Sequence, residues 1–351
     1  MDDLQTIVEL SHEFGTKEYV KGGGGNTSVK NENTLWVKPS GTTLAGLTEK
    51  TFVTMDRAKV DALYDTETPE ESAAREELVK NLMAEAVTNE AGRPSVEAPL
   101  HNVLDYKYVV HTHMVLANGM TCAKDGEATC RRLFPEAMWV EYIDAGYTLC
   151  MELNGRIESY AAKHGRHPEL ILLKNHGIFV SGNTPEAIRE VYGRVMSALR
   201  EEYDQAAVTE NLKLSATPPS PETEARIREL FGGDAANVTS SGAFPYVPGP
   251  ITPDHLVYAR AYPFTDELTE EAAQAYESKH GFAPKVVVSG DRVYGLGTTQ
   301  KNADLALEFS QDGAQVMQLA AAFGGIDYMT DRAREFIENW EVEAYRQKVA
   351  S

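Results

Sequence analysis

The order of strand-like and helix-like segments along residues 1–210 constrains the fold of this chain most. β-Type runs are predicted at Thr34–Lys38, Tyr106–His111, Met138–Ile143 and Leu170–Val180. Amphipathic helices are predicted at Leu4–Phe14, at Glu76–Val87 and from Pro185 to about Ala206. Several strands are close in sequence and their connections are irregular. We therefore predict a layered α/β domain with a mixed or antiparallel sheet.

Residues 213–224 are rich in proline, serine and threonine, a composition typical of a linker. We therefore expect a first domain over residues 1–212 and a smaller α+β unit over residues 225–351. The elements expected beyond the first domain are a helix near 222–231, strands at Lys285–Ser289 and Arg292–Leu296, and a helix from about Asn302 to Phe323. We find no internal repeat in the sequence.

The composition is that of a globular protein, with 42% hydrophobic and 25% charged residues among 351. Acidic residues outnumber basic ones by 53 to 33, and the net charge of −20 argues against a nucleic-acid partner. Three cysteines without CxxC spacing favour free thiols in a reducing compartment. The sequence has no run of 18 apolar residues, and its acidic start lacks the features of a signal peptide. We therefore expect a soluble cytoplasmic protein with no membrane partner.

Three histidines indicate a metal site. His111 and His113 flank one residue at the end of a predicted strand, and alternate strand residues point to the same face. His176 lies between Asn175 and Gly177, where an apolar run is interrupted. A lone HxH pair is more often a pair of ordinary core or surface histidines, but a third histidine beside a strand-breaking glycine favours a metal. Three imidazoles with an open fourth position are typical of a catalytic zinc site.

A glutamate lies just upstream of the histidine pair. Glu97, in the segment PSVEAPLH, can bind a metal weakly or move a proton once burial and the cation set its pKa. The alternative is an exposed loop or first-turn glutamate that the helix dipole favours, and Glu97 taken alone favours this alternative. His101, four residues later, is interpreted as a brace for this turn and not as a ligand.

Two glycine-bearing loops could bind an anion through backbone N–H groups and hydroxyls. The first loop is Lys21–Ser28 (KGGGGNTS) and the second is Lys38–Thr42 (KPSGT). Neither matches GxxxxGK[ST] or GxGxxG, and a glycine run alone is more often a flexible turn. Together with Ser95, the two loops could surround one phosphate group.

The motifs GGGGNTS, VKPSG, PSVEAPLH, HTHMVLAN and LLKNHGIFVSG occur in an order and spacing that resemble the class II aldolase/adducin family over about residues 1–210. The segment from PDHLVYAR to the Gly324-Gly325 pair resembles the extension in the aldolase half of bifunctional rhamnulose-phosphate aldolase/dehydrogenases. The resemblance implies a three-layer αβα sandwich with a mixed, mostly antiparallel central sheet. It also implies a homotetramer.

The resemblance assigns roles to individual residues. It makes His111, His113 and His176 the ligands of a zinc ion, or of another divalent ion, and Glu97 the acid/base. The residues implied to cradle a substrate phosphate are Gly25, Asn26, Ser28, Ser40, Gly41 and Ser95. A tyrosine that a neighbouring subunit supplies in fuculose-phosphate aldolase corresponds to Tyr142.

Two departures from the family pattern affect these assignments. Val96 replaces a serine that often precedes the glutamate, which removes one phosphate donor. Glu141 and Tyr147 replace the usual proline and threonine around the tyrosine, so the match of Tyr142 rests on its position.

These features predict a zinc-dependent aldehyde-lyase that cleaves a phosphorylated ketose to dihydroxyacetone phosphate and an aldehyde. The decarboxylases, epimerases and dehydratases of the family use the same enediolate chemistry. A decarboxylase is the nearest alternative, because only the leaving fragment changes. A non-enzymatic adducin-like module belongs to a different class, and we expect such a module to lose the three histidines that this chain keeps.

Overall fold

The computed structural model describes residues 3–340. The chain divides into two compact units. Unit 1 comprises Met1–Ala117 and Glu127–Leu199, and unit 2 comprises Asn118–Gly126 and Arg200–Ser351. In the described part of the chain, no helix combines the length and apolarity needed to cross a membrane.

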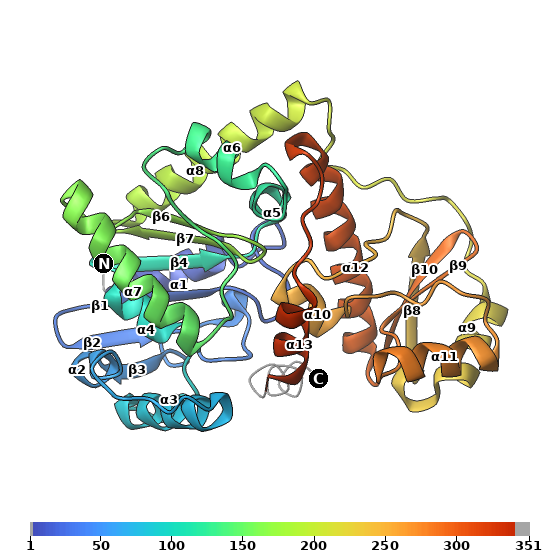
Figure 1. The fold of residues 1–351 in the computed structure, drawn as a ribbon, viewed down its shortest axis with the longest axis horizontal. Coiled ribbons are helices and arrows are strands. Elements are labelled where there is room, and N and C mark those ends of the chain that lie inside the picture. Colours follow the sequence, from blue (N-terminus) through green and yellow to red (C-terminus); the bar gives the residue numbers. More distant parts are fainter. Residues whose placement is uncertain (1–2, 341–351) are drawn as a thin grey trace. The chain divides into compact units, whose positions relative to one another are not determined.

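Unit 1 is built on a seven-stranded sheet with the strand order β3-β2-β1-β4-β7-β6-β5 (Figure 1). The strands are β1 (Asn26–Lys30), β2 (Thr34–Val37), β3 (Val53–Asp56), β4 (Tyr108–Thr112), β5 (Met138–Val140), β6 (Leu170–Leu173) and β7 (Gly177–Gly182). All neighbouring strands pair antiparallel except β5 and β6, which are parallel. The predicted mixed, mostly antiparallel sheet is therefore confirmed.

Helices cover both faces of this sheet and complete three layers. One face carries α1 (Asp3–Glu13) and α8 (Pro185–Gln205), and the Tyr192 hydroxyl of α8 lies 2.9 Å from the Thr112 hydroxyl of β4. The other face carries α2 (Arg57–Asp61), α3 (Ser72–Ala86), α4 (Ala98–Val103) and α7 (Tyr147–His164). Val109 and Phe179 of the sheet pack there in one buried cluster with side chains of α4 and α7. Helices α5 (Val115–Thr121) and α6 (Gly126–Leu133) lie between β4 and β5 in the chain.

The apolar run Leu170–Val180 forms the hairpin β6–β7, and the interruption at Asn175-His176-Gly177 lies at its turn. One expectation about local structure in unit 1 was wrong. The segment Asn26–Ser28 belongs to β1 and not to a loop, and β1 is buried throughout and paired with strands on both sides. Its polar residues gave no alternation of apolar and polar side chains, which is the pattern that identifies a strand in a sequence.

Unit 2 holds a smaller antiparallel sheet with the order β8-β10-β9. Its elements are α9 (Pro221–Phe231), β8 (Asn237–Gly242), α10 (Pro253–Tyr258), α11 (Glu270–His280), β9 (Val286–Ser289), β10 (Arg292–Gly297), α12 (Gln300–Ala320) and α13 (Asp331–Asn339). The predicted hairpin and the long helix after it are both present. The helix ends through a short 3₁₀ turn at Gly324, whose φ of 82° favours glycine.

Unit 2 repeats the topology of the second half of unit 1, although the sequence gave no sign of a repeat. Unit 1 contains the hairpin β6–β7, whose second strand pairs antiparallel with the earlier strand β4. Unit 2 contains the hairpin β9–β10, whose second strand pairs antiparallel with the earlier strand β8. A 21-residue helix comes next, α8 or α12. Each helix begins behind a threonine, Thr184 or Thr299, whose hydroxyl accepts a backbone N–H at 3.2 Å.

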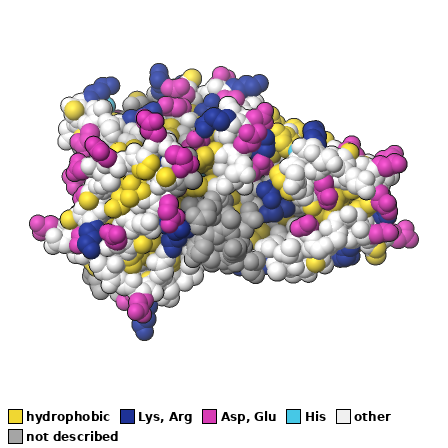
Figure 2. Space-filling model, turned by 60° about the horizontal axis from the view of Figure 1, so that its bottom comes forward, with side chains coloured by type: hydrophobic (Ala, Val, Ile, Leu, Met, Phe, Trp, Pro, Cys, Tyr) yellow, Lys and Arg dark blue, Asp and Glu magenta, His cyan; other side chains and the backbone are white. Residues whose placement is uncertain are grey.

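Figure 2 shows one face of the molecule, where acidic side chains are spread widely and basic ones lie singly among them. No continuous basic surface covers the described residues on this face. This distribution matches the excess of acidic residues, 53 against 33. A phosphorylated ligand must therefore be attracted by local groups and not by the overall field of the protein.

Candidate metal centre

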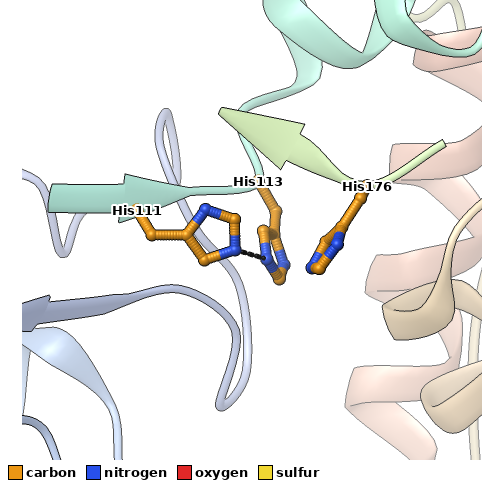
Figure 3. A group of neighbouring side chains, drawn as sticks. All are labelled: His111, His113 and His176. Carbon is orange, nitrogen blue, oxygen red and sulfur yellow. Dashed lines mark hydrogen bonds between the residues drawn. The ribbon is translucent and has the colours of Figure 1, made fainter. Parts of the chain in front are cut away.

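Three histidine side chains from two places in unit 1 meet at the end of the sheet (Figure 3). His111 is the fourth residue of β4, His113 directly follows that strand, and His176 lies in the turn between β6 and β7. One ring nitrogen from each histidine lies within 4.8 Å of the other two. The Nε2 atoms of His111 and His113 are 2.9 Å apart. The three histidines singled out in the sequence are thus brought together.

The local backbone explains how His176 reaches the other two histidines. Asn175 has a φ of 54°, in the left-handed region that asparagine tolerates better than most residues, and this turn reverses the chain at His176. A Cβ atom on Gly177 would lie 2.3 Å from the Thr112 carbonyl oxygen and 2.9 Å from the His113 ring. Only glycine therefore fits where β7 begins beside the end of β4.

The ring of His111 is fixed by the neighbouring strand. Its Nδ1 atom donates a hydrogen bond of 2.8 Å to the Ile178 carbonyl oxygen, and its ring stacks on Phe179 at 3.9 Å between centroids. Burial lowers the pKa of His111 well below its ordinary value, so the imidazole is neutral. Because Nδ1 carries the proton, the Nε2 lone pair faces the other histidines and is available to a metal.

Glu97 lies against this group. It is the residue before α4 and is buried, with carboxylate oxygens 3.6 Å from His111 Nε2 and 3.7 Å from His176 Nε2. Burial alone raises the pKa of Glu97, but the net shift is downward, and the hydrogen bond from Asn26 contributes to it by favouring the ionised carboxylate. Its Oε1 atom has no hydrogen-bond partner in the described part of the chain. The glutamate is therefore a buried carboxylate with one oxygen unsatisfied.

Asn26 holds the other oxygen of this carboxylate. The Asn26 amide nitrogen donates to Glu97 Oε2 at 2.6 Å and to the Ser95 hydroxyl at 3.1 Å. The Asn26 carbonyl oxygen accepts a hydrogen bond from His101 Nε2, and the Ser28 hydroxyl lies 2.6 Å from His101 Nδ1. Burial lowers the pKa of His101 to about 3, so its ring stays neutral, donating through Nε2 and accepting at Nδ1.

His101 is a brace, as expected, although its partners lie on β1 and not in its own turn. Sequence reasoning missed the link from Asn26 to Glu97, and it missed Phe179. Both follow from strand register, because β4 places His111 opposite Asn26 of β1 and opposite Phe179 of β7. Residues directly opposite in a sheet share a face.

The segments predicted to bind phosphate lie next to this group. The Ser40 N–H donates to the Arg93 carbonyl oxygen at 2.8 Å, and the Ser95 N–H donates to the Lys38 carbonyl oxygen at 3.1 Å. The second loop therefore pairs with the segment before Glu97. The buried Lys38 ammonium donates to the Gly23 carbonyl oxygen at 3.1 Å and joins the two loops. The Ser28 hydroxyl, which was predicted to bind phosphate, instead forms a hydrogen bond with the His101 ring.

Gly25 and Tyr142 occupy different kinds of position. Gly25 has a φ of 64°, and a Cβ atom there would lie 2.7 Å from the His111 carbonyl oxygen. The first loop can therefore approach the histidines only with glycine at this position.

Tyr142 lies half-buried in the loop between β5 and α7. Its role stays a prediction, because contacts within one chain cannot test a residue expected to act on a neighbouring subunit.

The donor set fits a divalent cation. Imidazole nitrogens are common ligands of zinc and similar ions, and three of them with one position left open are typical of catalytic sites. The unsatisfied Glu97 oxygen beside them is a buried anionic atom that a cation would stabilise. The fold and the site together define an α/β protein with a cluster of three histidines suited to a divalent cation.

The model of the family "Class II Aldolase and Adducin N-terminal domain" matches residues 5–200, and the chain belongs to this family. The chain is 25% identical over 191 residues to L-fuculose phosphate aldolase of Methanococcus vannielii, a match that covers 52% of this chain and 85% of that protein. The N-terminal class II aldolase domain of a conserved Thermoplasma acidophilum protein is similar in structure. That domain has a TM-score of 0.50 and 24% identity, and the match covers 57% of this chain and 94% of that one.

One relative is similar over nearly the whole chain. It is the uncharacterized oxidoreductase YuxG of Bacillus subtilis, 22% identical over 418 residues that include 99% of this chain. The chain spans 58% of the length of that relative. The family membership supports an aldolase-type function.

Proposed function

We propose that this protein is an aldehyde-lyase that cleaves a phosphorylated ketose to dihydroxyacetone phosphate and an aldehyde. The observation that carries the proposal is the buried Glu97 carboxylate, ionised and held by Asn26, within 4 Å of two of the three clustered histidines. A metal-dependent retro-aldol reaction uses a Lewis acid at the ketose oxygens and a group that moves a proton to the adjacent carbon.

His111, His113 and His176 would hold the cation, which we propose to be zinc. When bound, such an ion polarises the carbonyl and hydroxyl oxygens of the substrate. In cleavage, the proton lost by the hydroxyl group of the departing aldehyde would pass to the ionised Glu97, which would deliver it to the carbon freed by the broken C–C bond; in the reverse direction Glu97 would remove it from that carbon. Tyr142 of a neighbouring subunit would serve the oxygen of the departing aldehyde, a role that requires an oligomer, and we propose a tetramer because the family resemblance implies one.

The substrate phosphate would lie between the two loops and Ser95. Backbone N–H groups at Gly25 and Gly41 and the hydroxyls of Ser40 and Ser95 are suited to a dianion. Asn26 and Ser28 belong to the same segment, but their side chains bond to Glu97 and His101, so we propose that they shape the phosphate site by holding this segment in place. This arrangement would supply the local attraction that a chain of net charge −20 otherwise lacks.

A direct test of the reaction class is a screen of phosphorylated ketoses and phosphorylated keto acids. Dihydroxyacetone phosphate and carbon dioxide are followed by coupled assays on the metal-loaded protein. Release of dihydroxyacetone phosphate from a ketose phosphate supports the proposal. Release of carbon dioxide from a keto acid would instead identify a decarboxylase on the same site. Turnover of neither class, together with failure to take up metal, would favour an adducin-like module.

Replacing Ser40 by alanine should raise the Michaelis constant for the phosphorylated substrate about tenfold or more. A hydrogen bond to a charged group contributes roughly 1.5–3 kcal/mol, and the variant loses one such bond. Binding of the dephosphorylated analogue should barely change. Steady-state kinetics with both compounds check this expectation, and Ser159→Ala, which removes an exposed hydroxyl on α7, serves as a control. Equal effects on both compounds would show that Ser40 does not contact phosphate.

Replacing His101 by alanine should lower turnover about tenfold or more while the Michaelis constant and metal content stay the same. The variant leaves the buried Asn26 carbonyl oxygen without its donor, and an unsatisfied buried polar group costs about 1–3 kcal/mol. Glutamine can place an N–H near the position of Nε2, so His101→Gln should recover part of the loss. A variant with a lower melting temperature but unchanged turnover would limit His101 to a structural role.

A further inference from the structure

Unit 2 contains a polar cavity of about 280 Å³ that is lined by side chains of unit 2 alone. Its charged lining residues are Arg260, Lys285 and Asp234. The cavity also borders the first turn of α12 through Thr298 and Asn302. Neither the candidate metal centre nor the proposed reaction uses any of these residues.

Arg260 has an unusual backbone and an unsatisfied side chain. Its φ of 66° lies in the left-handed region that long side chains rarely adopt. Its guanidinium lies 4.1 Å from the centroid of the Phe282 ring. The buried Nε atom has no hydrogen-bond partner, and the carboxylates that act on the guanidinium, Glu338 and Asp234, do so without a direct ion pair among the described residues. Such a strained and unpaired cation is costly to keep unless it has a ligand.

Lys285 brings a second cation to the same cavity. Its ammonium donates to the Val257 carbonyl oxygen at 2.6 Å. Burial and the nearby Arg260 together lower the pKa of Lys285 to about 7, against the opposite influence of Asp234. Two basic side chains thus lie close to each other, with a single acidic side chain in the cavity lining.

The beginning of α12 adds to this positive potential. The helix has 21 residues, and the positive end of its dipole lies at the cavity. The Asn302 amide donates to the Thr298 hydroxyl at 3.3 Å, so these two side chains are ordered where they border the cavity. The planar guanidinium, the ammonium and these amide and hydroxyl groups match the donors that recognise phosphoryl oxygens.

We propose that this cavity binds a small phosphate-class anion, either inorganic phosphate or the phosphoryl group of a phosphorylated metabolite. Arg260 would bind two oxygens of the anion, and Lys285 would act as a point charge beside it. Asp234 would limit binding to ligands that bring enough negative charge to overcome its repulsion. The proposal does not depend on the reaction proposed for unit 1.

Hydrogen-exchange mass spectrometry of the full chain tests this proposal, because it separates phosphate bound in unit 2 from phosphate bound at the metal centre. Exchange is compared in inorganic phosphate and in sodium chloride of equal ionic strength. We expect slower exchange with phosphate in peptides covering residues 257–262 and 297–303. The protection should persist in Ser40→Ala. It should be lost in Arg260→Gln, which removes the charge and keeps the same backbone strain.

Two further variants complete the design. Lys285→Gln should weaken phosphate binding at this cavity at least tenfold, while Arg228→Gln, which removes an equal charge from the exposed face of α9, should leave the protection unchanged. Circular dichroism and the melting temperature identify any variant that fails to fold. The proposal is overturned if the wild-type peptides gain no protection, or if both Arg260→Gln and Lys285→Gln fold and keep the protection. Protection by malonate but not by phosphate would also overturn it.

Discussion

Replacing His176 by alanine should abolish turnover and remove the bound divalent metal. The site offers three imidazole nitrogens from this chain, and two of them come from neighbouring positions at the end of β4. Without His176, two ligands from one strand end remain, too few to hold an ion in a fixed geometry. The same loss is expected for His111→Ala and His113→Ala. Metal per chain is measured by mass spectrometry after dialysis, and turnover by release of dihydroxyacetone phosphate.

His164→Ala is a matched control for this prediction. His164 lies at the exposed end of α7 and stacks on Tyr160, so its removal should change neither metal content nor turnover. Full metal content and full activity in His176→Ala would exclude this residue from the site.

Replacing Glu97 by glutamine should lower turnover about 100-fold or more, the usual scale for general acid–base catalysis, while metal stays bound. Glutamine keeps the size of the side chain and loses the group that accepts a proton. The hydrogen bond from Asn26 to Oε2 can be kept by the amide oxygen, so the local packing is preserved. Turnover and metal content are measured on the same preparation.

The control for Glu97→Gln is Glu186→Gln, which changes an exposed carboxylate at the start of α8 and should leave both quantities unchanged. Unimpaired turnover in Glu97→Gln with metal bound would show that the carboxylate has only a structural role. Loss of metal together with activity would indicate that Glu97 acts mainly as a ligand.

The central part of the site was predictable because its signals are local. His111 and His113 sit two residues apart in a predicted strand, and the interruption at Asn175-His176-Gly177 marks a turn. The structure adds the reason for the glycine, since Gly177 leaves room for the His113 ring.

The groups that orient Glu97 were not predictable, because they depend on which strands are neighbours. Asn26 lies on a strand whose polar residues gave no pattern, and it is 71 positions from Glu97 in the chain. Once β1 pairs with β4, Asn26 lies opposite His111 and its amide reaches the carboxylate. Long-range pairing of this kind leaves no trace in the periodicity of either segment.

Unit 2 shows the same division between local and long-range information. The β9–β10 hairpin and α12 follow from a Gly-Asp turn between apolar runs and from a helical pattern ending at two glycines. The cavity beside them brings together Arg260 and Lys285, 25 positions apart, through a loop with a left-handed residue. Nothing in the sequence marks Arg260 as such a residue, because arginine rarely adopts this conformation.

The most direct test of the proposed reaction needs no knowledge of the aldehyde. An aldolase of this kind removes a proton from the hydroxymethyl carbon of dihydroxyacetone phosphate even when no aldehyde is present. Proton nuclear magnetic resonance in D₂O measures this exchange as deuterium incorporation at that carbon. We predict exchange with the metal-loaded protein, reduced about 100-fold or more in Glu97→Gln and absent in His176→Ala. A metal-loaded, folded protein that incorporates no deuterium above the buffer rate would contradict the proposed function.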